Sequence, residues 1–327
     1  MNGTIPIRAC LYCGGRSERA VFEGILDRLK FVPGEWSFYQ CRDCQSAVIH
    51  PFPDVKEIMN YYPPVYDFCP QSPSFFGRWL KKIEYHFFFR RQYLSQARLI
   101  LRKLGVPSAK GLKMLDVGCG HGLRMKEFVR LGFKVYGSDI SASAVSYVRQ
   151  GLGLEAVESD SADLSNHHKP ESLDIETSFY MIEHVPEVQK SLEVFNKLVK
   201  PGGTLVLATL LIDSQQSHFW GKRWAGVTEA PRHLTLPSEK GLRYACQAAG
   251  FTRVRLVPDS VLACTGVWML SLFPVLGRRH MGSAPRWDRL AIQLLAAIMS
   301  LLVMPWCWIE NHVLRRPALV FVFAGKR

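Results

Sequence analysis

The chain has 327 residues, a mass of 37.1 kDa and a formal charge of +13, with 48% apolar and 21% charged residues. This length allows one large domain with small additions, and the composition excludes a disordered chain. A sequence pI near 9.4 favours an anionic partner, which could be a membrane surface, a nucleic acid or a phosphorylated substrate.

The N-terminus and the cysteine count indicate the compartment. No apolar run follows a basic start between Met1 and Cys10, so we expect no secretory signal. The nine cysteines are an odd number in a chain large enough to form its own core, which argues against a disulfide framework. We therefore expect the protein on the cytoplasmic side.

Four cysteines form two close pairs near the N-terminus, Cys10 with Cys13 and Cys41 with Cys44. Each C-x-x-C pair brackets a tight turn that can direct two thiolates at one metal ion. Four sulfur ligands make a closed tetrahedral Zn²⁺ site, which favours a structural role over a catalytic one. The alternatives are a redox dithiol and unrelated buried cysteines.

The rest of the chain divides into three regions by composition. A connector of aromatic, proline-rich and then basic sequence follows the cysteines and is expected to end as a helix before Gly105. Alternating apolar strands and amphipathic helices then indicate a mostly parallel α/β sheet. We predict a zinc-ribbon module (1–53), the connector (54–110), an α/β domain (111–258, with a last strand in 318–327) and an apolar insertion (259–317).

The α/β domain contains the secondary-structure signals in regular order. Strands are expected at Lys113–Asp116, Lys134–Ser138, Leu154–Glu158, Leu173–Phe179, Thr204–Thr209, Thr252–Val257 and finally Ala318–Phe323. Helices are expected at Ser141–Gln150, Val188–Val199 and Ser238–Ala248, where Ser141 and Ser238 suit N-caps. Glu176 is unexpected, because it interrupts an otherwise apolar central strand.

The segment MLDVGCGHG between the first strand and a helix is the most informative one. The strand ends in Asp116, and Gly118, Gly120 and Gly122 follow at alternate positions, where glycine lets the backbone turn sharply and approach a ligand. A dinucleotide site would prefer glycine three residues after Gly120, but this chain has leucine there. An acidic residue before the loop would also repel a pyrophosphate.

These features fit S-adenosylmethionine (SAM), which has no phosphate and carries a positive ammonium and sulfonium. Asp139 ends the next strand, where it can accept hydrogen bonds from both ribose hydroxyls. Asp160, with Ser161, follows the third strand, where a carboxylate can receive the adenine amino group. The alternative is a glycine-rich turn in another nucleotide-binding sheet.

Five segments in order resemble the motifs of class I SAM-dependent methyltransferases. They are MLDVGCGHG (114–122), GSDIS (137–141), ESDSADL (158–164), YMIEHVPE (180–187) and LVKPGGTLVLAT (198–209). The resemblance implies a Rossmann-like seven-stranded sheet. It also implies that Asp116, Gly118 and Gly120 hold the methionine end of SAM, Asp139 and Ile140 the ribose, and Asp160 with Ser161 the adenine.

The segment HPFPDVKEIMNYYPPVY adds a second resemblance. A four-cysteine ribbon, this proline-rich step and a methyltransferase domain together resemble one bacterial subfamily, often associated with modification of sugars, glycolipids and other secondary metabolites. The resemblance specifies the fold and the cofactor far better than it specifies the methyl acceptor.

Three residues are candidates for the chemistry of the acceptor. His184 follows the fourth strand and His233 lies in APRHLTL after the fifth, so either is placed to remove a proton from a hydroxyl. Glu183 could orient His184 or bind the acceptor itself. The EHVP run is similar to that of quinone O-methyltransferases. The alternative is that both histidines are structural.

Two uncharged runs, Val261–Gly277 and Leu290–Ile309, precede the last strand and are joined by the basic linker RRHMGSAPRWDR. Each is about long enough to cross a bilayer. A crossing hairpin would place the arginines outside, contrary to the positive-inside tendency. We therefore predict an apolar helical hairpin lying in one leaflet, with residues 260–309 at the membrane surface. The alternative is a packing or dimer element.

These observations predict a SAM-dependent methyltransferase, peripheral or monotopic at the inner membrane. It would methylate a hydroxyl of a lipid-linked, glycan-like or quinone-like acceptor, with structural Zn²⁺ as a second bound group. The second hypothesis is C- or N-methylation of a soluble small molecule or nucleotide sugar. An RNA methyltransferase is disfavoured, because the basic residues accompany apolar runs, and a non-catalytic scaffold is disfavoured by the intact glycine loop. An oligomer is compatible with the sequence.

Overall fold

The computed structural model describes residues 7–28, 30–62, 85–274, 276 and 286–327. Two parts of the sequence analysis lie outside these residues. They are the aromatic and basic segment between 63 and 84, which includes Cys69, and most of the basic linker before 286.

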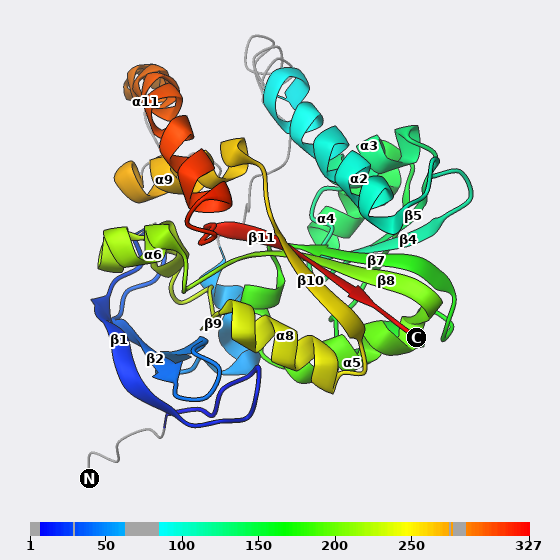
Figure 1. Ribbon diagram of the computed structural model, residues 1–327, viewed down its shortest axis with the longest axis horizontal. Coiled ribbons are helices and arrows are strands. Elements are labelled where there is room, and N and C mark those ends of the chain that lie inside the picture. The colour runs from blue at the N-terminus through cyan, green and yellow to red at the C-terminus, as the bar shows by residue number, and fades with distance from the viewer. Residues whose placement is uncertain (1–6, 29, 63–84, 275, 277–285) are drawn as a thin grey trace.

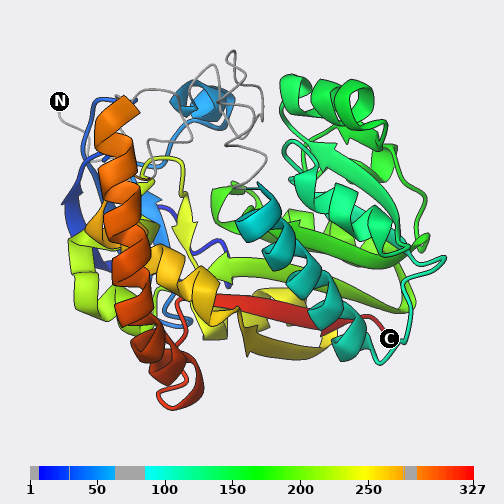
Figure 2. The ribbon, with the colours of Figure 1, turned by 90° about the horizontal axis from the view of Figure 1, so that it is seen from above.

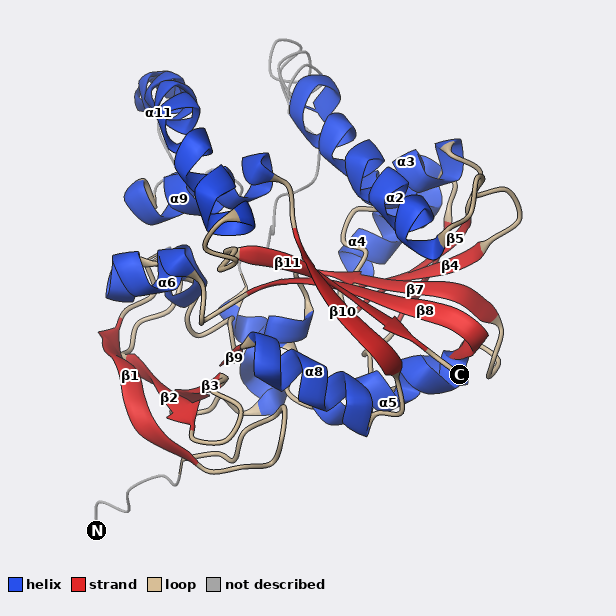
Figure 3. Ribbon diagram, in the orientation of Figure 1, coloured by secondary structure: helices blue, strands red, loops and turns tan. Residues whose placement is uncertain are grey.

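A seven-stranded sheet forms the centre of the molecule (Figures 1 and 3). Its strands are β4 (Lys113–Val117), β5 (Lys134–Asp139), β6 (Glu155–Glu158), β7 (Leu173–Phe179), β8 (Val199–Leu210), β10 (Thr252–Pro258) and β11 (Leu319–Gly325). The spatial order is β10-β11-β8-β7-β4-β5-β6. β11 runs antiparallel to β10 and β8, whereas the other pairs are parallel. This confirms the predicted sheet and its late antiparallel strand.

The predicted strands are found within a few residues, and the largest difference is at β8. This strand begins at Val199, five positions before the predicted start at Thr204. Val199 already pairs with Leu173, and the next pair is Ile175 with Thr204. The register shifts between these two pairs, and Gly202, whose φ is +80°, lies within the shift. Glycine tolerates that left-handed conformation, so the expected turn lies inside the strand.

Helices cover both faces of the sheet, because each strand alternates its side chains between two apolar clusters. One cluster packs against α5 (Val188–Leu198) and α8 (Glu239–Ala248). The other packs against α2 (Arg90–Leu104), α3 (Leu123–Arg130) and α4 (Ala142–Ser146). Figure 1 shows these helices on the two sides of the sheet, and Figure 2 shows the side that carries α2 from above.

The predicted N-caps are present. The Ser141 hydroxyl accepts from the Ala144 amide at 3.3 Å, and that of Ser238 accepts from Gly241 at 2.9 Å. The helix after Ser141 differs from the prediction, because α4 continues as a π-helical turn, Tyr147–Gly151. A second π-turn, Tyr85–Phe89, leads into α2, which ends before Gly105 as expected.

A second sheet holds the N-terminal region. Its four strands are β1 (Ser17–Ile25), β2 (Trp36–Cys41), β3 (Ala47–His50) and β9 (Thr235–Leu236), in that order. β9 comes from the segment after β8, and it pairs Thr235 with Val48 and Leu236 with Ala47. The 3₁₀ helix Val55–Tyr61 follows β3. The N-terminal sheet therefore includes part of the loop that follows His233.

The segments that surround this sheet are α6 (Gln215–Trp220), a 3₁₀ turn (Gly221–Arg223), α7 (Ala225–Thr228), α9 (Val261–Leu272) and α11 (Arg286–His312). The last two helices correspond to the predicted apolar runs and lie against each other (Figures 1 and 2). Within the described ranges, no helix is both long and apolar enough to span a membrane.

Glu176 is fully buried in the middle of β7, between Leu115 of β4 and Leu205 of β8. Neither carboxyl oxygen has a hydrogen-bond partner in the described part of the chain, and burial raises the pKa well above its usual value, which favours the neutral form. Glu176→Leu should raise the free energy of unfolding by about 1–3 kcal/mol, because it removes an unsatisfied buried polar group. Urea denaturation measures this change.

Glu176→Gln is the matched control, since it keeps an unpaired polar group of the same size and should change stability little. A lower urea midpoint for Glu176→Leu would contradict the expectation. We therefore expect that Glu176, the acidic residue in an otherwise apolar strand, reduces the stability of the protein.

Candidate functional site

The glycine loop lies at the carboxyl edge of the sheet and is held to the next strand. The amides of Gly118 and Cys119 donate to the Ser138 carbonyl at 2.8 and 2.9 Å. Gly118 and Gly120 have φ values of +71° and +53°, which L-residues rarely adopt. A Cβ at Gly118 would lie 2.7 Å from Cγ of Met181, whereas one at Gly120 would enter open space. The loop therefore leaves open space beside the backbone of Gly120, where a ligand can approach.

Asp139 joins this loop to the next helix. Its Oδ2 accepts from the Gly120 amide at 2.8 Å and its Oδ1 from the Ser141 amide at 2.9 Å. Ile140 beside it is 51% exposed, which is unusual for so large an apolar side chain. The structure thus brings Asp139, Ile140 and Gly120 together, as the sequence predicts.

Asp116 is buried beneath the loop. Its Oδ1 accepts from the Thr177 hydroxyl at 2.8 Å, while Oδ2 has no hydrogen-bond partner among the described residues. Burial raises the pKa of Asp116 to about 6, against the opposing charge of Arg124. An unsatisfied carboxylate oxygen is costly in a protein interior unless a cationic ligand pairs with it.

Asp160 and Ser161 follow β6 at the same edge. Oδ1 of Asp160 accepts from the Ala162 amide at 2.8 Å, and the Ser161 hydroxyl is 2.9 Å from that of Ser191 in α5. The Ser159 amide donates to the Asp139 carbonyl at 3.1 Å, so the two acidic segments are neighbours. Each acidic position therefore lies at the end of its strand, in register with the others.

Glu183, His184 and His233 also meet, although the two histidines are 49 positions apart in sequence. The 3₁₀ turn Ile182–His184 after β7 carries the first two, and the loop before β9 carries His233. The imidazole centroids are 4.7 Å apart in an edge-to-face arrangement. Glu183 is 1% exposed and accepts from the Thr209 hydroxyl at 2.9 Å. The structure therefore unites the three predicted candidates.

Backbone carbonyls determine the protonation of both rings. Nδ1 of His184 is 3.0 Å from the Arg232 carbonyl, and Nδ1 of His233 is 2.6 Å from the Gly226 carbonyl. A carbonyl oxygen only accepts, so each Nδ1 must carry the proton and each Nε2 a lone pair. Burial lowers the pKa of His184 to about 3 and that of His233 to about 4, which keeps both rings neutral.

The trio can interact with a proton or a cation. Burial raises the pKa of Glu183 to about 7, so this carboxyl changes protonation near neutral pH. One ligand atom from each of the three residues lies within 4.8 Å of the other two. The arrangement can accept a proton from a neighbouring hydroxyl, and its spacing would also admit a cation.

Sequence reasoning missed three residues of this site. The hydroxyl of Tyr62 lies 3.1 Å from Nδ1 of His184, and the fully buried Arg232 precedes His233. Asp27, in the loop between β1 and β2, contacts Arg232 at 2.8 Å. Tyr62 stood in a marked aromatic run and Arg232 beside a candidate histidine, but nothing around Asp27 signals a function.

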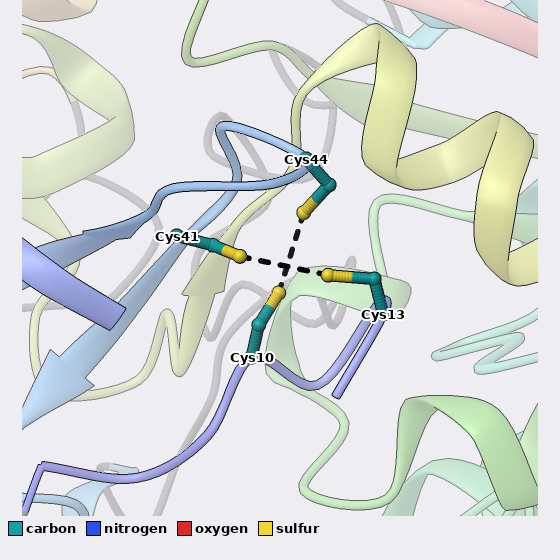
Figure 4. A group of neighbouring side chains, drawn as sticks. All are labelled: Cys10, Cys13, Cys41 and Cys44. Carbon is teal, nitrogen blue, oxygen red and sulfur yellow. Dashed lines mark hydrogen bonds between the residues drawn. The ribbon is translucent and has the colours of Figure 1, made fainter. Parts of the chain in front are cut away.

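The four cysteines converge from two hairpin turns, as Figure 4 shows. Sγ of Cys10 lies 3.4 Å from Sγ of Cys44, and Sγ of Cys13 lies 3.5 Å from Sγ of Cys41. The hydrogen bond from Cys10 lowers the pKa of the Cys44 thiol to about 5, so one thiolate is already favoured. All four sulfur atoms lie within 4.8 Å of one another.

The strand order and the glycine loop at the carboxyl end of β4 are those of the class I methyltransferase fold. The chain belongs to the methyltransferase-domain family, whose model matches residues 89–256, just over half of its length.

Curated relatives match a shorter part. The ubiquinone biosynthesis O-methyltransferase of Nitrosococcus oceani is 36% identical over 107 residues, 32% of this chain and 45% of that protein. The enzyme of the same name from Cupriavidus pinatubonensis is 31% identical over 111 residues, 32% of this chain and 44% of that protein. The chain thus spans less than half the length of these relatives.

Solved structures share a lower sequence identity with this chain than these curated relatives do. Phosphoethanolamine N-methyltransferase 2 from Haemonchus contortus has a TM-score of 0.49 and 16% identity, with 76% of this chain and 59% of that chain covered. A SAM-dependent methyltransferase from Archaeoglobus fulgidus has a TM-score of 0.45 and 17% identity, with 74% and 100% covered. Both TM-scores are below 0.5, so nothing about this chain rests on either likeness.

Proposed function

We propose that this protein is a SAM-dependent O-methyltransferase that methylates a phenolic hydroxyl of a quinone-like, membrane-held acceptor. The observation that carries the proposal is the pair of neutral imidazoles beside the carboxyl end of β7, in each of which a carbonyl at Nδ1 leaves Nε2 unprotonated. Methylation of a hydroxyl requires removal of its proton, and a neutral histidine is the usual group for this task.

The residues of the glycine loop fit SAM. The unsatisfied Oδ2 of Asp116 matches the cationic methionine end, and the open space at Gly120 admits a ligand against the backbone. Asp139 retains acceptor capacity for ribose hydroxyls beyond its two amide contacts, and the exposed Ile140 offers an apolar surface to a neighbouring ring. Asp160 and Ser161 would receive the adenine edge.

In the proposed mechanism the chain aligns the acceptor and removes its proton. SAM supplies an electrophilic methyl group, which the acceptor oxygen takes by in-line displacement. Nε2 of His184 would accept the proton of the attacking hydroxyl, because Nδ1–H is held by the Arg232 carbonyl. His233 and Glu183 would bind the acceptor beside it. The step would yield the O-methyl ether, S-adenosylhomocysteine and a proton on Nε2 of His184, which then passes to solvent.

Two observations support a lipid-linked acceptor. Curated relatives that match about a third of this chain are named for ubiquinone biosynthesis. In addition, α11 exposes a broad apolar face on which Ile298, Leu301 and Leu302 are 59%, 68% and 69% exposed. Exposed apolar side chains in such number mark an interaction surface, and the charge of +13 would favour anionic headgroups. We therefore propose peripheral attachment at the cytoplasmic face of the inner membrane.

A transfer assay with radiolabelled SAM and cell extract tests this function. After partition, label should appear in the organic phase, which holds prenylated phenols and glycolipids, and it should require the protein. Label only in the aqueous phase would replace the lipid acceptor with a soluble small molecule, a nucleotide sugar or RNA. No transfer to any fraction would exclude the enzyme in favour of a binding protein.

We also propose that the four cysteines hold a structural Zn²⁺. A tetrahedral site with Zn–S bonds of about 2.3 Å places its sulfur atoms about 3.8 Å apart, close to the 3.4 and 3.5 Å observed. All four positions are filled by sulfur, which leaves none for substrate. The ion would join the knuckle at Cys10 to the one at Cys44, whose carbonyl accepts from the Ser238 hydroxyl at 2.5 Å.

Cys41→Ser should release this metal and destabilise the N-terminal sheet, because binding energy at such sites contributes directly to folding. We expect zinc per chain to fall from one to near zero by elemental analysis, with a lower thermal midpoint. Cys246→Ser, at a buried thiol outside the cluster, is the control and should retain the metal. Full zinc content in Cys41→Ser would reject the site.

A further inference from the structure

A buried ion pair links the loop between β1 and β2 to the candidate acceptor site. The guanidinium of Arg232 is fully buried, and its Nη2 and Nη1 donate to Oδ1 and Oδ2 of Asp27 at 2.8 and 3.3 Å. Nη1 also donates to the Tyr61 carbonyl at 3.2 Å. The side chain of Arg232 thus attaches the loop before β9 to two separate points of the N-terminal region.

Asp27 is itself fixed in place. Its Oδ2 accepts from the amides of Phe31 and Val32 at 2.8 and 3.0 Å. Burial tends to raise the pKa of Asp27, but Arg232 and these amides outweigh it, and the net pKa is lowered. The carboxylate therefore stays charged, and it can anchor the guanidinium in a rigid bidentate geometry.

The backbone of the same arginine contacts the candidate base. The Arg232 carbonyl accepts from Nδ1 of His184, and the hydroxyl of Tyr62 lies at 3.1 Å from the same atom. Because the carbonyl requires a proton on Nδ1, the Tyr62 oxygen can only be a second acceptor there. The tautomer of His184 is thus determined by where the backbone of residue 232 lies.

We propose that Asp27 is a positioning residue: through Arg232 it holds the carbonyl that keeps Nε2 of His184 unprotonated and directed at the acceptor. The loop between β1 and β2 then contributes to the active site, and the N-terminal region is more than an attached module. This inference rests on the proposed function for its catalytic meaning, but the tautomer can be measured without any methyl transfer.

The first measurement is nitrogen-15 NMR of histidine-labelled full-length protein, with the His184 signal assigned by its loss in His184→Gln. We expect a protonated Nδ1 and an unprotonated Nε2. Tyr62→Phe should leave this pattern unchanged, because the carbonyl alone requires it. A wild-type His184 that carries its proton on Nε2 would overturn the proposal.

The test variant is the double replacement Asp27→Leu with Arg232→Met. It removes both charges together, since a single replacement would leave one buried charge unpaired and could unfold the chain. With a thermal midpoint showing a folded protein, the His184 signal should shift to a mixture of tautomers. An unchanged tautomer in the folded double variant would show that Asp27 does not position the ring.

Turnover of a short-chain prenylated catechol gives the functional readout. The double variant should lose about 10–100-fold in kcat, as expected for misplacement of a reacting group, while the KM for SAM stays within about twofold. Combined with His184→Gln, the double replacement should cause little further loss, because both act on one group. Full additivity would contradict the proposal.

Lys190→Gln, which removes the exposed pair that Lys190 forms with Glu187 at 3.3 Å, is the control and should leave turnover unchanged. If no acceptor is methylated even by the wild type, the proposed function fails, while the NMR result still decides whether Asp27 controls His184.

Discussion

His184→Gln is expected to lower kcat on a prenylated catechol by about 10²–10⁴-fold, the usual contribution of a general base. Glutamine can still contact the Arg232 carbonyl but has no lone pair of comparable basicity. Affinity for S-adenosylhomocysteine, measured by calorimetry, should change little, because the glycine loop and its acidic residues are separate from this ring. Wild-type turnover in His184→Gln would exclude the histidine as the base.

The pH dependence sharpens this test. Since burial lowers the pKa of His184 to about 3, the neutral base persists throughout the range from pH 5 to 8, and no loss of rate is expected near the ordinary histidine pKa of about 6.5. A change near pH 7 would instead come from Glu183, whose pKa burial raises to about 7. Glu183→Gln should abolish that change, and His184→Gln should not.

Asp139→Ala is expected to weaken the binding of SAM by about 10²–10⁴-fold. Two charge-assisted hydrogen bonds to ribose hydroxyls would be lost, each worth about 1.5–3 kcal/mol. The variant also releases the amides of Gly120 and Ser141, so the loop loses part of its preorganised shape. Calorimetric titration with S-adenosylhomocysteine measures the effect.

Lys134→Ala, at the exposed start of the same strand, is the control for a general effect on β5 and should bind the ligand normally. Circular dichroism should show that Asp139→Ala remains folded. Normal affinity in this variant would remove Asp139 from the cofactor site, even if the fold is unchanged.

Local sequence determined much of the α/β domain. The strands were predictable because a strand buried on both faces appears in the sequence as an apolar run. The caps at Ser141 and Ser238 were predictable because a hydroxyl at the N-cap position accepts a hydrogen bond from a free helix amide. Asp116, Asp139 and Asp160 could be placed at one edge because the carboxyl ends of parallel strands always meet there. The two cysteine pairs could also be recognised from local sequence, because each C-x-x-C turn spans only four residues.

The tertiary structure alone decided what surrounds the candidate base. His184 and His233 were found as separate signals, but their tautomers depend on the carbonyls of Arg232 and Gly226, and a carbonyl has no sequence signature. Asp27 lies 205 residues from the arginine that it binds. The pairing of β3 with β9 likewise depends on tertiary structure. It joins two strands far apart in sequence through backbone hydrogen bonds, which almost any residue can make.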